Sequence, residues 1–122
     1  MQDSIIQKKT EDFAVSIVEL YKLLTDGRKE YILSKQILRS GTSIGANIAE
    51  AEVSQSRKDF FHKCYIAYKE LSETMYWLRL LLKTGYISQD IFNKYISDAE
   101  EIKRILGKII STTRDKLNNK EG

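Results

Sequence analysis

The sequence contains no proline, and its 122 residues include only one cysteine and one histidine. Without proline nothing interrupts a helix from within, and this favours an all-α fold. A single cysteine, Cys64, cannot form an internal disulfide, and its apolar surroundings predict a small core residue. No apolar run approaches the roughly 20 residues that a membrane-spanning helix requires. We therefore expect no membrane association.

The sequence also has few groups suited to catalysis or metal binding. His62 stands two positions before Cys64, whereas side chains on a helix meet at spacings of three or four, so the two do not form a nucleophile–base pair. We expect His62 at the surface. Carboxylate di-metal sites in helical bundles use Glu-x-x-His motifs, and the sequence has none. We expect a non-enzymatic protein with no catalytic residue, no cofactor and no metal.

The numbers of basic and acidic residues are nearly equal. Twenty lysines and arginines against 17 acidic residues give a formal net charge of +3, which permits a nucleic-acid partner without requiring one. The N-terminal residues show no charged segment followed by an apolar run, as a signal peptide would. We therefore expect a cytoplasmic protein.

Hydrophobic periodicity predicts four helices in one domain spanning residues 1–122. Their expected ranges are about Ile5 to Thr25, Glu30 to Glu52, Arg57 to Thr84 and Gln89 to Leu117. Short connections favour antiparallel neighbours, and the predicted fold is an all-α, antiparallel up-down-up-down four-helix bundle. Gly27 and Gly85 are the expected helix stops, with Gly27 in the left-handed capping conformation. Either Ser54 or Ser56 is suited to cap the third helix.

The third helix carries more apolar surface than a bundle core needs. Its first stripe steps by three or four and comprises Phe60, Cys64, Ala67, Leu71, Met75, Leu78 and Leu82. A second stripe lies beside it and comprises Phe61, Tyr65, Tyr68, Tyr76, Trp77 and Leu81. Two stripes indicate a helix that is buried on more than one side or contributes to a subunit interface. This pattern predicts a homo-oligomer.

Small residues dominate the segment 40–52 of the second helix. A glycine within a helix costs about 1 kcal/mol relative to alanine, so Gly41 and Gly45 suggest a close approach of another helix, with Ala49 continuing the row. Asn47 has two interpretations. The favoured one is a structural role in fixing the register of helix packing; the alternative is a ligand contact shared with Ser43 and Glu50.

Basic residues are spread over all four helices, and most such charges simply face solvent. Arg57 and Lys58, with Lys63 following, form the densest group, and Arg39 lies on the second helix. Assembly of several copies would bring such residues into one shared patch and raise its local potential. We therefore interpret these four residues as the candidate nucleic-acid-binding set.

The run Leu38-Arg39-Ser40-Gly41-Thr42-Ser43-Ile44-Gly45-Ala46-Asn47-Ile48-Ala49-Glu50-Ala51 carries a family likeness, continued by Phe60, Ile66-Ala67, Lys69-Glu70, Glu73-Thr74 and Tyr76-Trp77-Leu78-Arg79. The sequence resembles the bacterial four-helix bundle proteins related to the protein encoded by intervening sequences of large-subunit ribosomal RNA genes, sometimes labelled ribosomal. It is also similar to the accessory protein of diversity-generating retroelements, a basic pentameric barrel that binds nucleic acid. Where many relatives have glycine after the Asn-Ile-Ala-Glu core, this chain has Ala51.

The resemblance implies a bundle that assembles into a ring, with a pentamer favoured, and it supplies no catalytic residue. Two functions follow from the residues and the resemblance together. The leading one is a homo-oligomeric binding module for structured RNA or another nucleic acid. The alternative is an adaptor that binds a protein partner through its apolar or small-residue helix surface.

Overall fold

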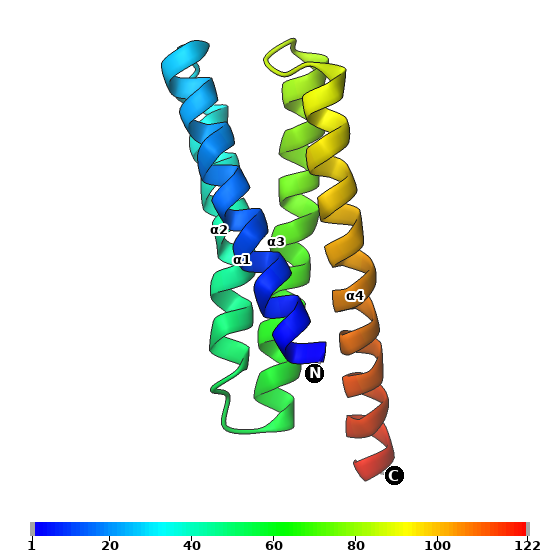
Figure 1. The fold of residues 1–122 in the computed structure, drawn as a ribbon. Helices are drawn as coiled ribbons and strands as arrows, with labels where there is room; N and C mark the ends of the chain where they lie inside the picture. The colour runs from blue at the N-terminus through cyan, green and yellow to red at the C-terminus, as the bar shows by residue number, and fades with distance from the viewer. Residues whose placement is uncertain (1, 122) are drawn as a thin grey trace.

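Four helices make up the chain in a computed structural model, which describes residues 2–121 and, for side chains, residues 5–119. They are α1 (Gln2–Lys22), α2 (Leu33–Ala51), α3 (Arg57–Lys83) and α4 (Gln89–Glu121), and a π-helical turn, η1 (Leu23–Gly27), continues α1. Figure 1 shows two helical hairpins, α1–α2 and α3–α4, side by side. The predicted all-α four-helix bundle is confirmed, with boundaries that differ from the expected ones by a few residues.

The core is built from the apolar rows that the periodicity indicates. On α3 the first stripe is buried from Cys64 to Leu78. On α4 the buried row comprises Tyr95, Ala99, Ile102, Leu106, Ile109 and Thr113. The Tyr95 hydroxyl crosses to α1 and donates a 2.8 Å hydrogen bond to the Ser16 carbonyl. Burial at three- and four-residue spacing thus places one face of each helix in a common interior.

The end of α1 differs from the expectation for Gly27. Gly27 does not have a positive φ; the left-handed residue of this turn is Lys29, with a φ of 56°. The helix widens into η1 before it stops, and the Arg28 amide donates to the Leu23 carbonyl at 3.3 Å. This wider turn provides the hydrogen-bond donor for one of the last carbonyls of the helix. The left-handed residue therefore lies two positions after Gly27, at Lys29.

The start of α2 is fixed by a buried carboxylate. Glu30 is 8% exposed, and its two carboxylate oxygens accept hydrogen bonds from the amides of Ile32, Leu33 and Ser34 at 2.7–3.1 Å. These amides belong to the first helical turn and have no partner within the helix. Glu30 therefore precedes α2, and the helix begins at Leu33 rather than at Glu30.

The connections α2–α3 and α3–α4 contain a serine cap and a glycine stop, as the sequence predicted. Ser56 is the N-cap of α3, and its hydroxyl accepts a 3.0 Å hydrogen bond from the Asp59 amide. Gly85 follows α3 with a φ of +83°, a conformation that favours glycine. Both connections are short, so consecutive helices run antiparallel.

Two glycines of α2 face α1 closely. A Cβ atom on Gly41 would lie 2.8 Å from the Cγ1 atom of Ile17, and one on Gly45 would lie 3.2 Å from the carbonyl oxygen of Thr10. Ala49 does not continue this row: its side chain is exposed. The prediction of helix packing at Ala49 is wrong, because the α1–α2 crossing lies nearer Gly41 and Gly45, and Ala49 borders an open groove between the two helices.

Candidate nucleic-acid interface

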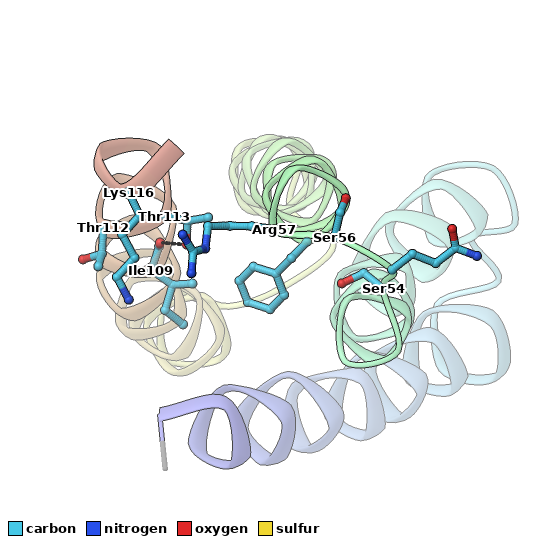
Figure 2. A pocket seen from close by; sticks show the side chains of 9 residues that line it. Ser54, Ser56, Arg57, Ile109, Thr112, Thr113 and Lys116 are labelled. Carbon is cyan, nitrogen blue, oxygen red and sulfur yellow. Dashed lines mark hydrogen bonds between the residues drawn. The ribbon is translucent and has the colours of Figure 1, made fainter. Parts of the chain in front are cut away.

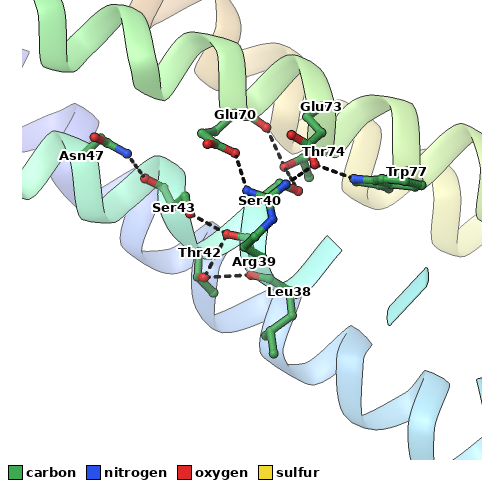
Figure 3. Close-up of polar contacts among 10 residues, drawn as sticks. All are labelled: Leu38, Arg39, Ser40, Thr42, Ser43, Asn47, Glu70, Glu73, Thr74 and Trp77. Atoms are coloured by element: carbon green, nitrogen blue, oxygen red, sulfur yellow. Dashed lines mark hydrogen bonds and ion pairs between the residues drawn. The ribbon is translucent and has the colours of Figure 1, made fainter. Parts of the chain in front are cut away.

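Arg39 on α2 is held by two carboxylates of α3 (Figure 3). Its guanidinium lies 3.2 Å from the Glu70 carboxylate and also contacts Glu73. The Trp77 indole donates a 2.9 Å hydrogen bond to Glu73; this bond, outweighing partial burial and aided by Arg39, lowers the pKa of Glu73. Arg39 thus joins α2 to α3 and faces two negative charges. These two carboxylates reduce the positive field that Arg39 offers to a phosphate, so its predicted role in nucleic-acid binding stays a prediction.

Lys63 is also engaged in an ion pair. Its ammonium lies 2.7 Å from the Glu50 carboxylate of α2, and that hydrogen bond raises the pKa of Lys63. The partner charge cancels most of the field that Lys63 would offer to a phosphate. Of the four predicted basic residues, Arg39 and Lys63 therefore serve contacts between α2 and α3.

Asn47 bonds within its own helix. Its side-chain amide donates a 2.9 Å hydrogen bond to the Ser43 carbonyl, and the Ser43 hydroxyl in turn donates to the Arg39 carbonyl at 2.6 Å. Glu50, the third member of the suggested ligand group, is directed to Lys63. Each of these three side chains already makes a polar contact, and the contacts do not converge on a common point.

Arg57 opens onto a cleft between the start of α3 and the end of α4 (Figure 2). Lys116 of α4 lies on the same cleft, which has a volume of about 550 Å³. The lining comprises Ser54, Gln55, Ser56, Arg57, Phe60, Ile109, Thr112, Thr113 and Lys116. It contains two cations, four hydroxyls and no carboxylate. Among the described residues neither Arg57 nor Lys116 is in an ion pair, so both charges face the cleft uncompensated.

Lys58 is directed to a different surface from Arg57. It lies on a second, open hollow with Ser56, Asp59, Phe61 and His62. The two adjacent cations of the sequence are therefore separated, because successive residues of a helix project about 100° apart. His62 is exposed, as predicted, and Cys64 is buried in the core.

The end of α4 supplies a further cation that sequence reasoning did not select. The Arg114 guanidinium lies 5.7 Å from the centroid of the Phe61 ring, within the range of a cation–π interaction. Phe61 is stacked with Tyr65, one turn along α3, with centroids 6.2 Å apart and ring planes 6° apart. Arg114 and Lys116 were detectable in the sequence only as two of several basic residues; the antiparallel topology places them beside Arg57 and Phe61.

The side chains around the cleft between α3 and α4 offer groups that can bind a ligand. Within the described part of the chain no three His, Cys, Asp or Glu side chains gather in a group that could hold a metal ion. None of the described helices is both long and apolar enough to cross a membrane. Arginine and lysine match the acceptor oxygens of phosphate groups, whereas the Ser54 and Thr113 hydroxyls already donate to backbone carbonyls. The cleft between α3 and α4 is therefore suited to an anionic ligand.

The fold defines a four-helix bundle protein, and its cleft between α3 and α4 is lined by two cations and no carboxylate. Residues 2–108 match the model of the family described as 23S rRNA-intervening sequence protein, and the chain belongs to that family. A crystal structure of a protein of unknown function from the S23 ribosomal protein family of Bacteroides thetaiotaomicron VPI-5482 is similar, with 52% identity and a TM-score of 0.90. The match covers 91% of this chain and 99% of that one. Comparison with curated proteins gives no match.

Proposed function

We propose that this protein is a non-enzymatic, homo-oligomeric module that binds structured RNA or another nucleic acid. The observation that carries this proposal is a cleft whose lining contains both Arg57 and Lys116 and no carboxylate. Among the described residues neither cation is in an ion pair, and both lie on the lining of one cleft. The family description, which refers to an intervening sequence of 23S rRNA, supports RNA as the nucleic acid.

The small net charge of one chain makes assembly part of the proposal. Binding to phosphates releases counterions, and the effect grows with the number of phosphates neutralised. One cleft can contact only a few phosphates. A ring of several copies repeats the cleft, so the number of phosphate contacts on one surface increases. A pentamer remains the favoured ring on the resemblance of the sequence.

An exposed aromatic side chain on α3 supports assembly. Tyr76, from the second apolar stripe, is 49% exposed, and aromatic residues are enriched at interface cores. Light scattering on the purified protein should give a mass several times 14.2 kDa. A monomer at micromolar concentration would overturn the oligomeric part of the proposal.

RNA binding is tested by charge reversal at the cleft with a matched control. Fluorescence anisotropy with a labelled, structured RNA should show salt-dependent binding by the parent protein. Arg57→Glu with Lys116→Glu should weaken it and lower the slope of log affinity against log salt by about 2. The control, Lys103→Glu with Arg104→Glu, changes the same charge at two exposed residues elsewhere on α4 and should have a smaller effect.

The outcomes separate the candidate functions. Absence of binding by the parent at low salt overturns the nucleic-acid proposal. Equal loss in both double variants means diffuse attraction to a basic surface and removes the cleft as the site. Light scattering on each variant confirms that assembly is unchanged.

A protein-binding adaptor is the second candidate, and one observation favours it. Ile5, Val15 and Leu23 are large apolar side chains of the first helical segment, and each is about half exposed. A partner that covers them would bury apolar area, which stabilises association. Replacement of Val15 and Leu23 by glutamate should abolish capture of such a partner while leaving RNA affinity unchanged.

A further inference from the structure

The stacked rings of Phe61 and Tyr65 follow Arg57 along α3 and lie outside the lining of the Arg57 cleft. Arg57, Phe61 and Tyr65 are spaced by four residues and therefore lie on one side of the helix, where Phe61 also borders the hollow that Lys58 lines. Arg114 reaches this face from α4 and lies over Phe61. We call these residues, Arg57, Phe61, Tyr65 and Arg114, a row. It begins with a cation at the cleft and continues with two stacked rings, one of which has a cation over it.

This row has the composition of a surface for an unpaired nucleotide. Proteins bind single strands by combining cations that follow the phosphates with aromatic rings on which bases stack. Tyr65 remains 43% exposed although Phe61 covers part of one side, so its ring can still accept a base. The faces of paired bases are stacked inside a duplex and cannot contact Tyr65. A duplex could therefore contact only the cations of the row, through its phosphates.

Electrostatics distinguishes this row from the rest of α3. Farther along the helix, Glu70 and Glu73 hold Arg39, and Trp77 bonds to Glu73. The aromatic Trp77 therefore stands beside negative charge. At Phe61 the cation Arg114 lies over the ring, where it can attract a phosphate, while the carboxylate of Asp59 borders the hollow beside Phe61.

We infer that the Arg57–Tyr65 face of α3, together with Arg114, binds a single-stranded segment of the nucleic acid, with phosphate at the cleft and a base stacked on Tyr65. This inference rests on the proposed nucleic-acid-binding function and adds the class of segment that is recognised. A loop or bulge of a structured RNA supplies such a segment.

The test compares a labelled 12-nucleotide oligouridine with a 12-base-pair RNA duplex in the same anisotropy assay. Tyr65→Ala should weaken oligouridine binding roughly fivefold or more and leave duplex binding unchanged, whereas Tyr65→Phe should retain both. Arg57→Glu should weaken binding to both probes. The control is Tyr31→Ala, since Tyr31 is 51% exposed in the α1–α2 connection and should change neither.

Each contrary result has a distinct meaning. If the parent binds the duplex but Tyr65→Ala leaves oligouridine affinity unchanged, the stacking inference is wrong and the proposed function stands. If the parent binds neither probe and no structured RNA, both fail together. If Tyr65→Ala lowers the oligomer mass in light scattering, Tyr65 belongs to a contact between copies of the chain, and the inference is overturned.

Discussion

The hydroxyls of Ser40 on α2 and Thr74 on α3 lie 2.9 Å apart in a hydrogen bond, and both side chains are fully buried. Thr74 is also 2.8 Å from the Glu70 carbonyl of its own helix. The pair lies beside the Arg39 ion pairs (Figure 3), so polar contacts join α2 and α3 in the interior as well as at the surface.

This geometry predicts unequal effects for the two hydroxyls. Thr74→Val keeps the volume but leaves Ser40 without its partner, which should cost about 1–3 kcal/mol of unfolding free energy. Ser40→Ala should cost less, because Thr74 keeps the Glu70 carbonyl. Chemical denaturation of both variants and of the double variant measures the difference. Equal losses for the two single variants would contradict the assignment.

The glycines of the helices should respond to alanine according to the space beside them. Gly41→Ala places a methyl group 2.8 Å from buried Ile17 and should destabilise by about 1–3 kcal/mol through overpacking. Gly107→Ala meets nothing nearer than 3.8 Å and should stabilise by up to about 1 kcal/mol, because alanine is the better helix former. Denaturant midpoints of the two variants should therefore move in opposite directions.

Substitutions at Gly45 test how much added side-chain volume the contact with the Thr10 backbone tolerates. Its added methyl group would meet the Thr10 carbonyl at 3.2 Å, so the strain and the gain in helix propensity nearly cancel and Gly45→Ala should be close to neutral. Gly45→Leu has no such space and should cost about 1–3 kcal/mol or more. A leucine variant as stable as the parent would place Gly45 away from the helix crossing.

The Glu30 cap predicts a loss of stability in acid. Burial alone would raise its pKa, but hydrogen bonds from Leu33, Ser34 and Ile32 outweigh burial and lower it from 4.5. A carboxyl with a lowered pKa stabilises the fold above its unfolded-state pKa, and this contribution disappears as pH falls through the folded-state value.

Glu30→Gln should accordingly cost about 1–2 kcal/mol at pH 7, the scale of a lost helix cap. The difference from the parent should shrink as the pH falls below about 4.5. Glu52→Gln, at an exposed residue after α2, is the control. Unfolding free energies measured from pH 7 to pH 3 decide the matter, and a pH-independent difference would contradict the cap.

Arg39 should matter little for RNA and modestly for stability. Its side chain is 49% exposed, and exposed ion pairs contribute about 0–1 kcal/mol. Arg39→Gln should therefore lower the unfolding free energy by less than about 1 kcal/mol and leave RNA affinity near that of the parent. Arg57→Gln in the same assay should weaken RNA binding. A larger effect at Arg39 than at Arg57 would support the sequence-based interpretation.

Local sequence patterns determined much of the fold. Three- and four-residue apolar spacing located all four helices and most of the buried rows, because one helix face must be buried whatever the neighbouring element is. Ser56 was one of the two serines suggested as the cap of α3, and Gly85 was the expected stop after it; both follow because capping depends on a few adjacent residues. Gly27 is not the left-handed cap that was expected, because the π-helical turn moved the left-handed position to Lys29.

The candidate site depended on contacts that no local pattern contains. The sequence grouped Arg39, Arg57, Lys58 and Lys63 by charge alone; only the packing of α2 against α3 gave Arg39 and Lys63 carboxylate partners. The antiparallel course of α4 brought Lys116 and Arg114, more than 50 positions away, to Arg57 and Phe61. Whether a surface cation is compensated depends on distances of a few ångströms between helices, and tertiary structure alone sets these distances.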